Sequence, residues 1–137
     1  MEINGIAHTF LTCGDFPRAK SFYGKLLPAL GLQPVLDTDD TLYCVGGRTA
    51  FGIRASDKPA SDNRFDQASC GLHHICFRMR EREHVDDLYA LLQELGAHIV
   101  HPPQEDGWAP GYYSILFEDP DGIRLEANYV PGKGLLA

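Results

Sequence analysis

The sequence contains no run of lysine or arginine, and its acidic residues outnumber its basic ones. It carries 19 Asp and Glu against 12 Lys and Arg, for a formal net charge of −7. Nucleic acids and anionic lipid surfaces attract clustered positive charge, which this chain does not offer. We therefore expect neither nucleic acid nor a membrane as a partner.

Long apolar segments are also missing, since none approaches the roughly 20 residues that a membrane-spanning helix needs. Residues 1–5 contain no basic region followed by an apolar one, so we expect no signal peptide. The four cysteines lack the paired spacing of metal-binding motifs. They could form two disulfides, but without a secretion signal we expect reduced thiols and a cytoplasmic protein.

The chain does contain enough apolar material for one folded domain. Hydrophobic residues make up 44% of its 137 residues and aromatic residues 10%, which excludes a disordered protein. Apolar residues recur at helical spacing between Asp15, a suitable helix N-cap, and Gly31, a natural helix end. Segments rich in β-branched and aromatic residues predict strands around this helix, at 6–11, 33–36, 41–45 and 49–54.

The second half of the chain repeats this order after a polar linker or long loop at about 56–70. A second helical pattern ends at Gly96, 65 residues after Gly31. Strands are predicted before and after it, at 71–79, 97–100, 112–117 and 123–130. We therefore predict an α+β protein with one domain over residues 1–137, built from two βαβββ modules at about 3–55 and 71–130.

Glu126 is the first candidate for a functional site. The Asp-Pro-Asp-Gly segment at 119–122 predicts a turn between two strands. Side chains alternate along a strand, so Glu126 should lie on the face opposite Leu125 and Ala127. On its own, this segment is also compatible with an ordinary hairpin that has one solvated face.

Two histidines lie on other predicted strands. Ile75 and Phe77 define one apolar face, so His74 should point to the other face. His73 lies on the apolar face and should be a packing residue or a residue that contacts the ligand instead of the metal. His8 lies in the middle of the first predicted strand. Together with Glu126 these strands offer two imidazoles and one carboxylate, a set that suits a divalent metal with open coordination positions.

Three segments of the chain resemble the vicinal oxygen chelate superfamily: HTFLTCGDFPRAKSFYGKLLPALGL at 8–32, HHICFRM at 73–79 and FEDPDGIRLEANY at 117–129. That superfamily includes glyoxalase I, fosfomycin-resistance transferases, methylmalonyl-CoA epimerase, extradiol dioxygenases and bleomycin-resistance proteins. The resemblance covers roughly residues 3–130. It implies that the curled sheets of the two modules form a shared cleft with the helices outside. It also implies that His8, His74 and Glu126 bind one divalent metal.

The resemblance to glyoxalase I is incomplete at one position. That enzyme has a fourth protein ligand, a glutamate from the matching strand of the first module. Here the corresponding residues are near Phe51 and Gly52, and the nearest polar side chain is that of Arg54. None of these residues can bind a divalent cation. We therefore expect three protein ligands and weak glyoxalase I activity.

These features predict a metal-dependent lyase, isomerase or epimerase that acts beside a carbonyl of a small molecule, with Glu126 as the catalytic group. The metal would be Zn, Ni, Mn or Fe(II). An Fe(II) extradiol-type dioxygenase is one alternative. A binding protein that sequesters a small molecule, as bleomycin-resistance proteins do, is another. The ligand pattern speaks against the last alternative, because those members do without the metal.

Four further residues are candidates for substrate binding. Arg54, Arg78 and Arg124 would favour an anionic substrate if they faced the cleft, or could instead be salt-bridged on the surface. Trp108 lies in the segment 101–111, which could close over the cleft mouth or be an ordinary surface connection. The resemblance also implies a homodimer, and modules of this superfamily pair either within one chain or across a dimer.

Overall fold

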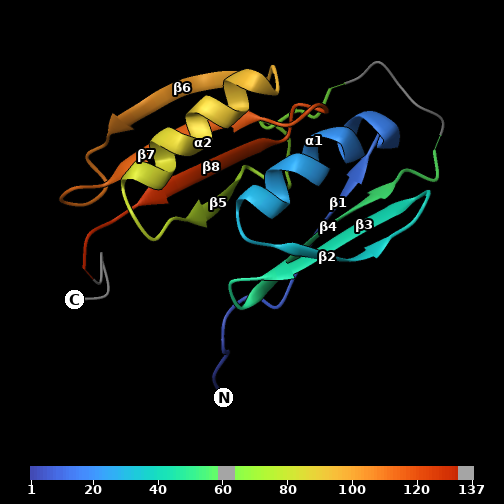
Figure 1. The fold of residues 1–137 in the computed structure, drawn as a ribbon, viewed down its shortest axis with the longest axis horizontal. Helices are drawn as coiled ribbons and strands as arrows, with labels where there is room; N and C mark the ends of the chain where they lie inside the picture. The colour runs from blue at the N-terminus through green and yellow to red at the C-terminus, as the bar shows by residue number, and fades with distance from the viewer. Residues whose placement is uncertain (59–63, 133–137) are drawn as a thin grey trace. The chain divides into compact units, whose positions relative to one another are not determined.

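The protein is organised as two compact units on either side of residues 59–63. A computed structural model describes residues 1–58 and 64–132, and the first of these segments forms one unit and the second the other. Both units have the element order β-α-β-β-β (Figure 1). This order agrees with the internal repeat predicted from the sequence.

The first unit is a four-stranded sheet with one helix. Its elements are β1 (Thr9–Cys13), α1 (Phe16–Ala29), β2 (Gln33–Asp37), β3 (Thr41–Gly46) and β4 (Thr49–Ala55). The strands lie in the order β1-β4-β3-β2. Strand β1 runs parallel to β4, and the other neighbours are antiparallel.

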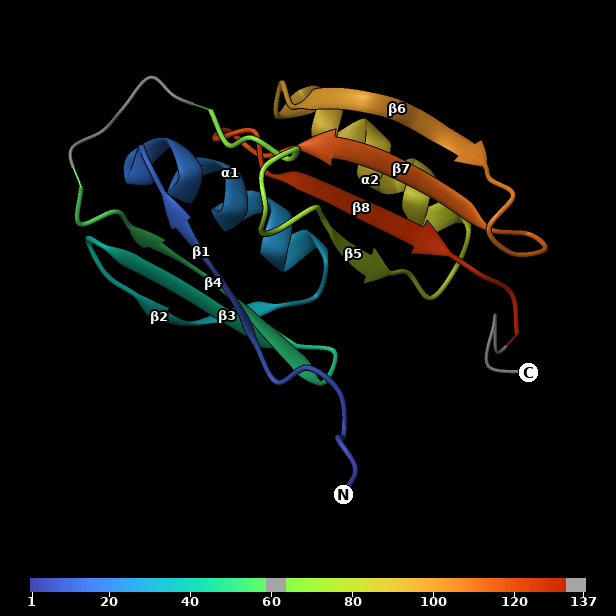
Figure 2. The same ribbon diagram turned by 180° about the vertical axis from the view of Figure 1, so that it is seen from behind.

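The second unit has the same topology. Its elements are β5 (Ile75–Arg78), α2 (Glu83–Glu94), β6 (His98–Glu105), β7 (Tyr113–Glu118) and β8 (Arg124–Tyr129). Figure 2 shows β7 and β8 in the middle of this sheet, which has the order β5-β8-β7-β6. The α+β class and the two βαβββ modules are thus confirmed, whereas a cleft shared by the two modules stays a prediction.

Helix α1 begins and ends where its sequence predicts. The Asp15 side chain accepts a hydrogen bond from the Arg18 amide at 3.0 Å, which is the usual N-cap contact. Gly31 follows the helix with φ of 83°, a conformation that favours glycine. The apolar stripe of the helix, including Tyr23 and Leu26 at 0% exposure, packs on β3 and β4.

Helix α2 packs on the sheet of the second unit through Val85, Leu88 and Leu92, which are buried. A cation–π contact supports its start, because the Arg82 guanidinium lies 3.7 Å from the centre of the Tyr113 ring. The Tyr113 hydroxyl also donates a hydrogen bond to Asp86 at 2.7 Å. These contacts tie the first turn of the helix to β7. Among the residues that the structure describes, neither α1 nor α2 has the length and apolar character of a membrane-spanning helix.

Strand β6 is longer than predicted. Its expected end was Val100, but it continues to Glu105 and takes in residues 101–105 of the segment 101–111, which was predicted to be a loop. The register shifts between Ile99 and His101 and again between His101 and Gln104. Proline is tolerated at such irregularities on an edge strand, because it need not donate to a neighbour there. The predicted strand end at Val100 is therefore wrong.

The second half of the predicted linker contacts the second unit. Residues 59–63 lie outside the described part of the chain, but the residues after them belong to the second unit. Arg64 pairs with Glu118 at 2.7 Å, and the Phe65 amide donates to the Asp121 carbonyl at 2.8 Å. The chain is thus attached to the β7–β8 turn from Arg64 onward.

Candidate metal-binding site

The Asp-Pro-Asp-Gly turn sets the direction in which β8 leaves. The Asp119 carboxylate is 3% exposed and accepts hydrogen bonds from the amides of Asp121 at 2.9 Å and Ile123 at 2.8 Å. Gly122 adopts φ of 88° and donates its amide to the Asp119 carbonyl at 3.0 Å. Because backbone donors satisfy the buried carboxylate, the turn has one well-defined shape.

Strand β8 has the alternating faces that its sequence predicts. Leu125 and Ala127 are 0% exposed, on the face covered by α2, and Glu126 lies between them on the other face. The Glu126 side chain is 13% exposed, so its carboxylate is largely removed from water. A carboxylate in such a place needs a compensating partner.

His74 is one such partner. Its Nε2 atom lies 3.1 Å from Oε2 of Glu126. Two ligands about 2.0–2.2 Å from one metal ion, at a usual coordination angle, lie roughly 2.8–3.6 Å apart. The pair therefore has a spacing that fits two neighbouring ligands of one ion, and it also suits an ion pair when His74 is protonated. Two of the three predicted ligands are brought together in this way.

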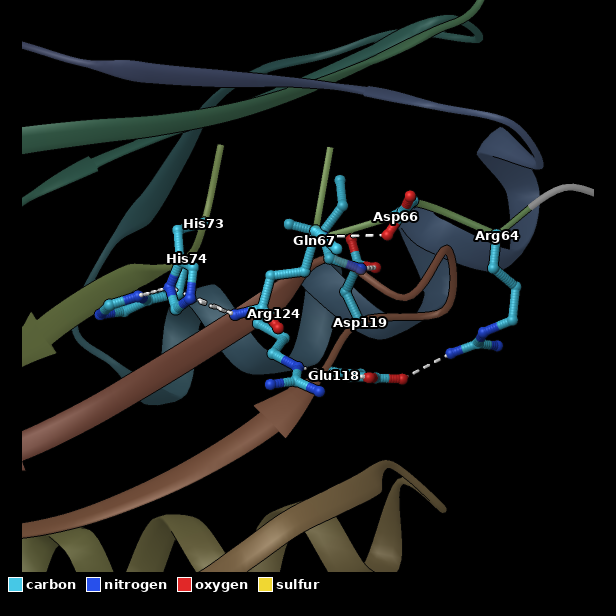
Figure 3. A network of polar contacts seen from close by, with 10 residues as sticks. Arg64, Asp66, Gln67, His73, His74, Glu118, Asp119 and Arg124 are labelled. Carbon is cyan, nitrogen blue, oxygen red and sulfur yellow. Dashed lines mark hydrogen bonds and ion pairs between the residues drawn. The ribbon is translucent and has the colours of Figure 1, made fainter. Parts of the chain in front are cut away.

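Alternation along the strand does not separate His73 from His74. Strand β5 begins at Ile75, so neither histidine lies within it. Their Nδ1 atoms lie 2.7 Å apart, and Nε2 of Gln67 lies 3.1 Å from the nearer ring nitrogen of His73 (Figure 3). His73 thus contacts the predicted ligand, and the choice of His74 over His73 as the metal ligand stays a prediction. This contact influences which nitrogen of His74 carries a proton.

Tyr112 is a site residue that the sequence analysis missed. Its hydroxyl donates a hydrogen bond to Oε1 of Glu126 at 2.5 Å. Burial, followed by this bond to Glu126, raises the pKa of Tyr112 above its ordinary value. The alternation of side chains along the strand could have indicated it. Tyr112 lies two residues before Ser114 and so should share its face. Ser114 pairs with Asn128, whose side chain lies on the same face of the sheet as that of Glu126.

Cys76 lies directly beside Glu126, since the two residues are partners in the parallel β5–β8 register. Loss of solvation around its sulfur, and then the charge of Glu126, raises the pKa of Cys76 to about 12. Part of the residue is nevertheless exposed at the surface. Without a metal this thiol is protonated at neutral pH and is a poor nucleophile.

His8 belongs to the first unit, and its surroundings are aromatic. It lies just before β1, with its ring edge-on to Phe10 at 5.9 Å and to Tyr43 at 6.4 Å. Phe10 and Tyr43 stack on each other with centroids 5.3 Å apart. Because His74 and Glu126 lie in the second unit, the predicted set of three ligands stays a prediction. Among the described residues, no group of three or more His, Cys, Asp or Glu is arranged to hold a metal ion.

The predicted substrate-binding residues lie in different surroundings. Arg54 is exposed on β4, whereas Arg78 donates to the Gly132 carbonyl at 3.4 Å. Arg124 lies 3.6 Å from Glu118, a carboxylate that it shares with Arg64 (Figure 3). Trp108 is 76% exposed and does not pack as a core residue. A role in substrate binding stays a prediction for all four.

A family comparison gives the chain a wider context. The model of the Glyoxalase/Bleomycin resistance protein/Dioxygenase superfamily matches residues 5–127. The uncharacterized protein YqjT of Bacillus subtilis is 22% identical over 120 residues, which cover 87% of this chain and 94% of that protein.

Solved structures resemble the fold closely. A Bacillus halodurans protein described provisionally as a glyoxalase has a TM-score of 0.79 and 24% identity, covering 93% of this chain and 96% of its own. A glyoxylase/bleomycin resistance protein/dioxygenase domain from Frankia has a TM-score of 0.74 and 25% identity, with coverages of 93% and 98%. Lactoylglutathione lyase from Agrobacterium tumefaciens has a TM-score of 0.68 and 22% identity, with coverages of 94% and 96%. At these identities the likeness establishes the fold and not the reaction.

Proposed function

Because this chain belongs to the glyoxalase/bleomycin resistance protein/dioxygenase superfamily, we propose that it is a metal-dependent enzyme acting beside a carbonyl of a small molecule. The reaction would be a lyase, isomerase or epimerase step. The observation that carries this proposal is the 3.1 Å approach of His74 Nε2, just before β5, to Glu126 Oε2 on the neighbouring strand β8. Divalent metals and small-molecule substrates are common in the superfamily, which supports the same conclusion.

The proposed ligands are His8, His74 and Glu126, and the proposed ion is Zn, Ni, Mn or Fe(II). When bound, the ion would stabilise negative charge on a substrate oxygen. Imidazole and carboxylate donors suit all four of these ions. The low exposure of the Glu126 carboxylate, 13%, supports a cation at this place, because a largely buried negative charge needs a compensating partner.

Glu126 is the proposed general base. A base must reach the proton that it removes within about 2.6–3.2 Å, either directly or through one water molecule. Its Oε1 atom is engaged by Tyr112, so Oε2 is the oxygen that is available on the His74 side. Because the same oxygen is the proposed metal ligand, we propose that it would take the proton from a carbon beside the substrate carbonyl when it is released from the ion.

The aromatic pair beside His8 is a proposed contact for the apolar part of the substrate. Phe10 is 45% exposed, and its ring stacks on that of Tyr43. A flat apolar surface of this kind binds planar or hydrophobic groups without fixing their polar chemistry. Arg54, Arg78, Arg124 and Trp108 remain proposed contacts for the rest of the substrate.

Two other functions use part of the same geometry. An Fe(II) extradiol-type dioxygenase would need the same two histidines and one carboxylate. A sequestering protein would use the exposed aromatic pair Phe10 and Tyr43 and would not need the metal. The identity of a metal retained through purification separates these cases: iron favours the dioxygenase, whereas zinc, nickel or manganese favours the lyase or isomerase.

The metal site is tested by titrating stripped protein with Zn²⁺, Ni²⁺, Mn²⁺ and Fe²⁺ under anaerobic conditions. We expect one ion per chain for the wild type and loss of binding for His74→Ala. His73→Ala is the matched control, because it removes a neighbouring imidazole and should keep most of the affinity. Equal binding by wild type and His74→Ala would overturn the proposal.

The proposed active form is a homodimer, in line with the resemblance noted from the sequence. Light scattering at micromolar concentration should give the mass of two chains. A monomer under these conditions would contradict this part of the proposal and leave the metal-binding part intact.

A further inference from the structure

The Glu126 carboxylate is held at both oxygens by different partners. Oε1 accepts the Tyr112 hydroxyl at 2.5 Å, and Oε2 lies 3.1 Å from the imidazole of His74. An ionised carboxylate can only accept hydrogen bonds, so the phenol is the donor in the first contact. Hydrogen bonds to a charged acceptor are short and strong, which fits the 2.5 Å distance.

The loop before β7 is built so that Tyr112 keeps this position. The Asp106 amide donates to the Tyr112 carbonyl at 3.0 Å, and the Tyr112 amide donates to the Ala109 carbonyl at 3.0 Å. The Asp106 carboxylate accepts the Ser114 hydroxyl at 2.8 Å, on the other side of Tyr112 in sequence. Both backbone groups of Tyr112 are thus bonded within the loop, which fixes the point from which its side chain reaches Glu126.

We propose that Tyr112 is a positioning residue for Glu126, which ties down one carboxylate oxygen and leaves the other to act as a single metal ligand beside His74. This inference rests on the proposed metal site and concerns a residue outside the predicted ligand set. Groups that orient a metal ligand typically contribute about 10–100-fold to metal affinity or activity. Tyr112 belongs to this class because it touches the ligand and not the ion.

The preference of the proposed site for one metal ion over another follows from the single Glu126 oxygen that is left to bind it. Ca²⁺ takes 6–8 oxygen ligands and often binds both oxygens of one carboxylate. Zn²⁺ accepts one carboxylate oxygen together with imidazole nitrogens in a four-coordinate site. The hydrogen bond from the Tyr112 hydroxyl to Oε1 of Glu126 therefore favours a small ion with nitrogen ligands over Ca²⁺. Removing the phenol would allow Glu126 to turn and offer both oxygens.

The chain supplies a matched control in the adjacent residue. Tyr113 also donates its hydroxyl to a carboxylate, that of Asp86, at 2.7 Å. Tyr112→Phe and Tyr113→Phe each remove one hydroxyl and keep the ring. Thermal unfolding of both metal-free variants measures the loss of stability, so that a general structural effect is separated from an effect on Glu126.

The test measures Zn²⁺ and Co²⁺ affinity by competition with a chelating dye, and the visible absorption of the Co²⁺ protein. We expect Tyr112→Phe to bind Zn²⁺ about 10–100-fold more weakly, with a weaker Co²⁺ spectrum because a carboxylate that binds through both oxygens raises the coordination number. Tyr113→Phe should match the wild type in both measurements, and Zn²⁺ should lose part of its advantage over Ca²⁺ only in Tyr112→Phe.

Three outcomes would contradict the proposed role of Tyr112. Unchanged affinity and spectrum in Tyr112→Phe would overturn the role of Tyr112 and leave the metal site standing. Equal weakening in Tyr112→Phe and Tyr113→Phe would also overturn it, because the effect would then be one of general stability. Zn²⁺ binding by the wild type no tighter than by His74→Ala would overturn the metal site and this inference together.

Discussion

The two units of the protein have the same topology but different chemistry at the same place. In the second unit, Cys76 of β5 lies opposite Glu126 of β8 in the parallel register. In the first unit, Phe10 of β1 lies opposite Gly52 of β4 in the equivalent register. The position that carries the carboxylate in one unit thus carries no side chain in the other.

The size of the residue across the strand explains the difference. A Cβ atom added to Gly52 would lie 2.4 Å from Cε1 of Phe10, so the aromatic ring occupies the space that a longer side chain would need. Glycine in a strand is often covered by an aromatic neighbour in this way. In the second unit the smaller Cys76 leaves room for Glu126. One copy of the module therefore provides polar ligands, and the other an apolar surface beside His8.

The largest effect is expected when the second unit is made to match the first. Glu126→Gly removes the proposed ligand and base together, so metal affinity should fall by more than about 100-fold, beyond the range expected for an orienting residue. Titration of stripped protein with Zn²⁺ measures this. Glu118→Gln, which removes a nearby carboxylate paired with Arg64, should keep the affinity. Loss of Zn²⁺ binding in both variants would show that the lower negative charge, and not the loss of Glu126 as a ligand, weakens binding.

The wild-type protein is also expected to have a low kcat when it is assayed for glyoxalase I activity. Only one of the two module positions carries a glutamate, so Glu126 can move a proton on one face of the substrate only. With Zn, Ni, Mn or Fe(II) added, lactoylglutathione formation from the methylglyoxal hemithioacetal should have a kcat well below the ordinary enzyme range of about 1–10³ s⁻¹. A kcat within that range would mean that the glutamate absent at Gly52 is not needed.

A smaller effect is expected when the first unit is made to match the second. Gly52→Glu should lower the free energy of unfolding by about 1–3 kcal/mol, because the new side chain meets the Phe10 ring. Phe10→Cys in the same chain copies the pair of the second unit and should remove part of this cost. Chemical denaturation of the two single variants and the double variant measures the coupling between them. Additive effects would mean that the two side chains do not compete for the same space.

The smallest effect is expected from Phe10→Ala alone. The ring is 45% exposed, and an aromatic pair contributes about 0.5–1.5 kcal/mol beyond the area that it buries. Stability should fall by a similar amount, and metal affinity should stay within a factor of a few. If the ring is also a substrate contact, KM should rise with little change in kcat. Phe65→Ala, which removes a comparably exposed ring from the second unit, is the control.

Local patterns in the sequence were sufficient for the repeated plan of the chain. The N-cap at Asp15 and the helix ends at Gly31 and Gly96 depend on residues close in sequence, so propensity and capping rules identify them. The same holds for the alternation that places Glu126 opposite Leu125 and Ala127. Strand ends were less well predicted, since β6 passes through two prolines by shifting its register on an edge of the sheet.

The amino-acid sequence by itself determined the two βαβββ modules, the turn at residues 119–122 and the face on which Glu126 lies, because short-range periodicity and turn chemistry encode all three. Only the tertiary structure decided that Tyr112 holds Glu126, that His73 touches His74 and that Phe10 covers Gly52. These contacts depend on strand register and on where a strand begins. Both result from pairing between distant segments, which no local pattern in the chain specifies.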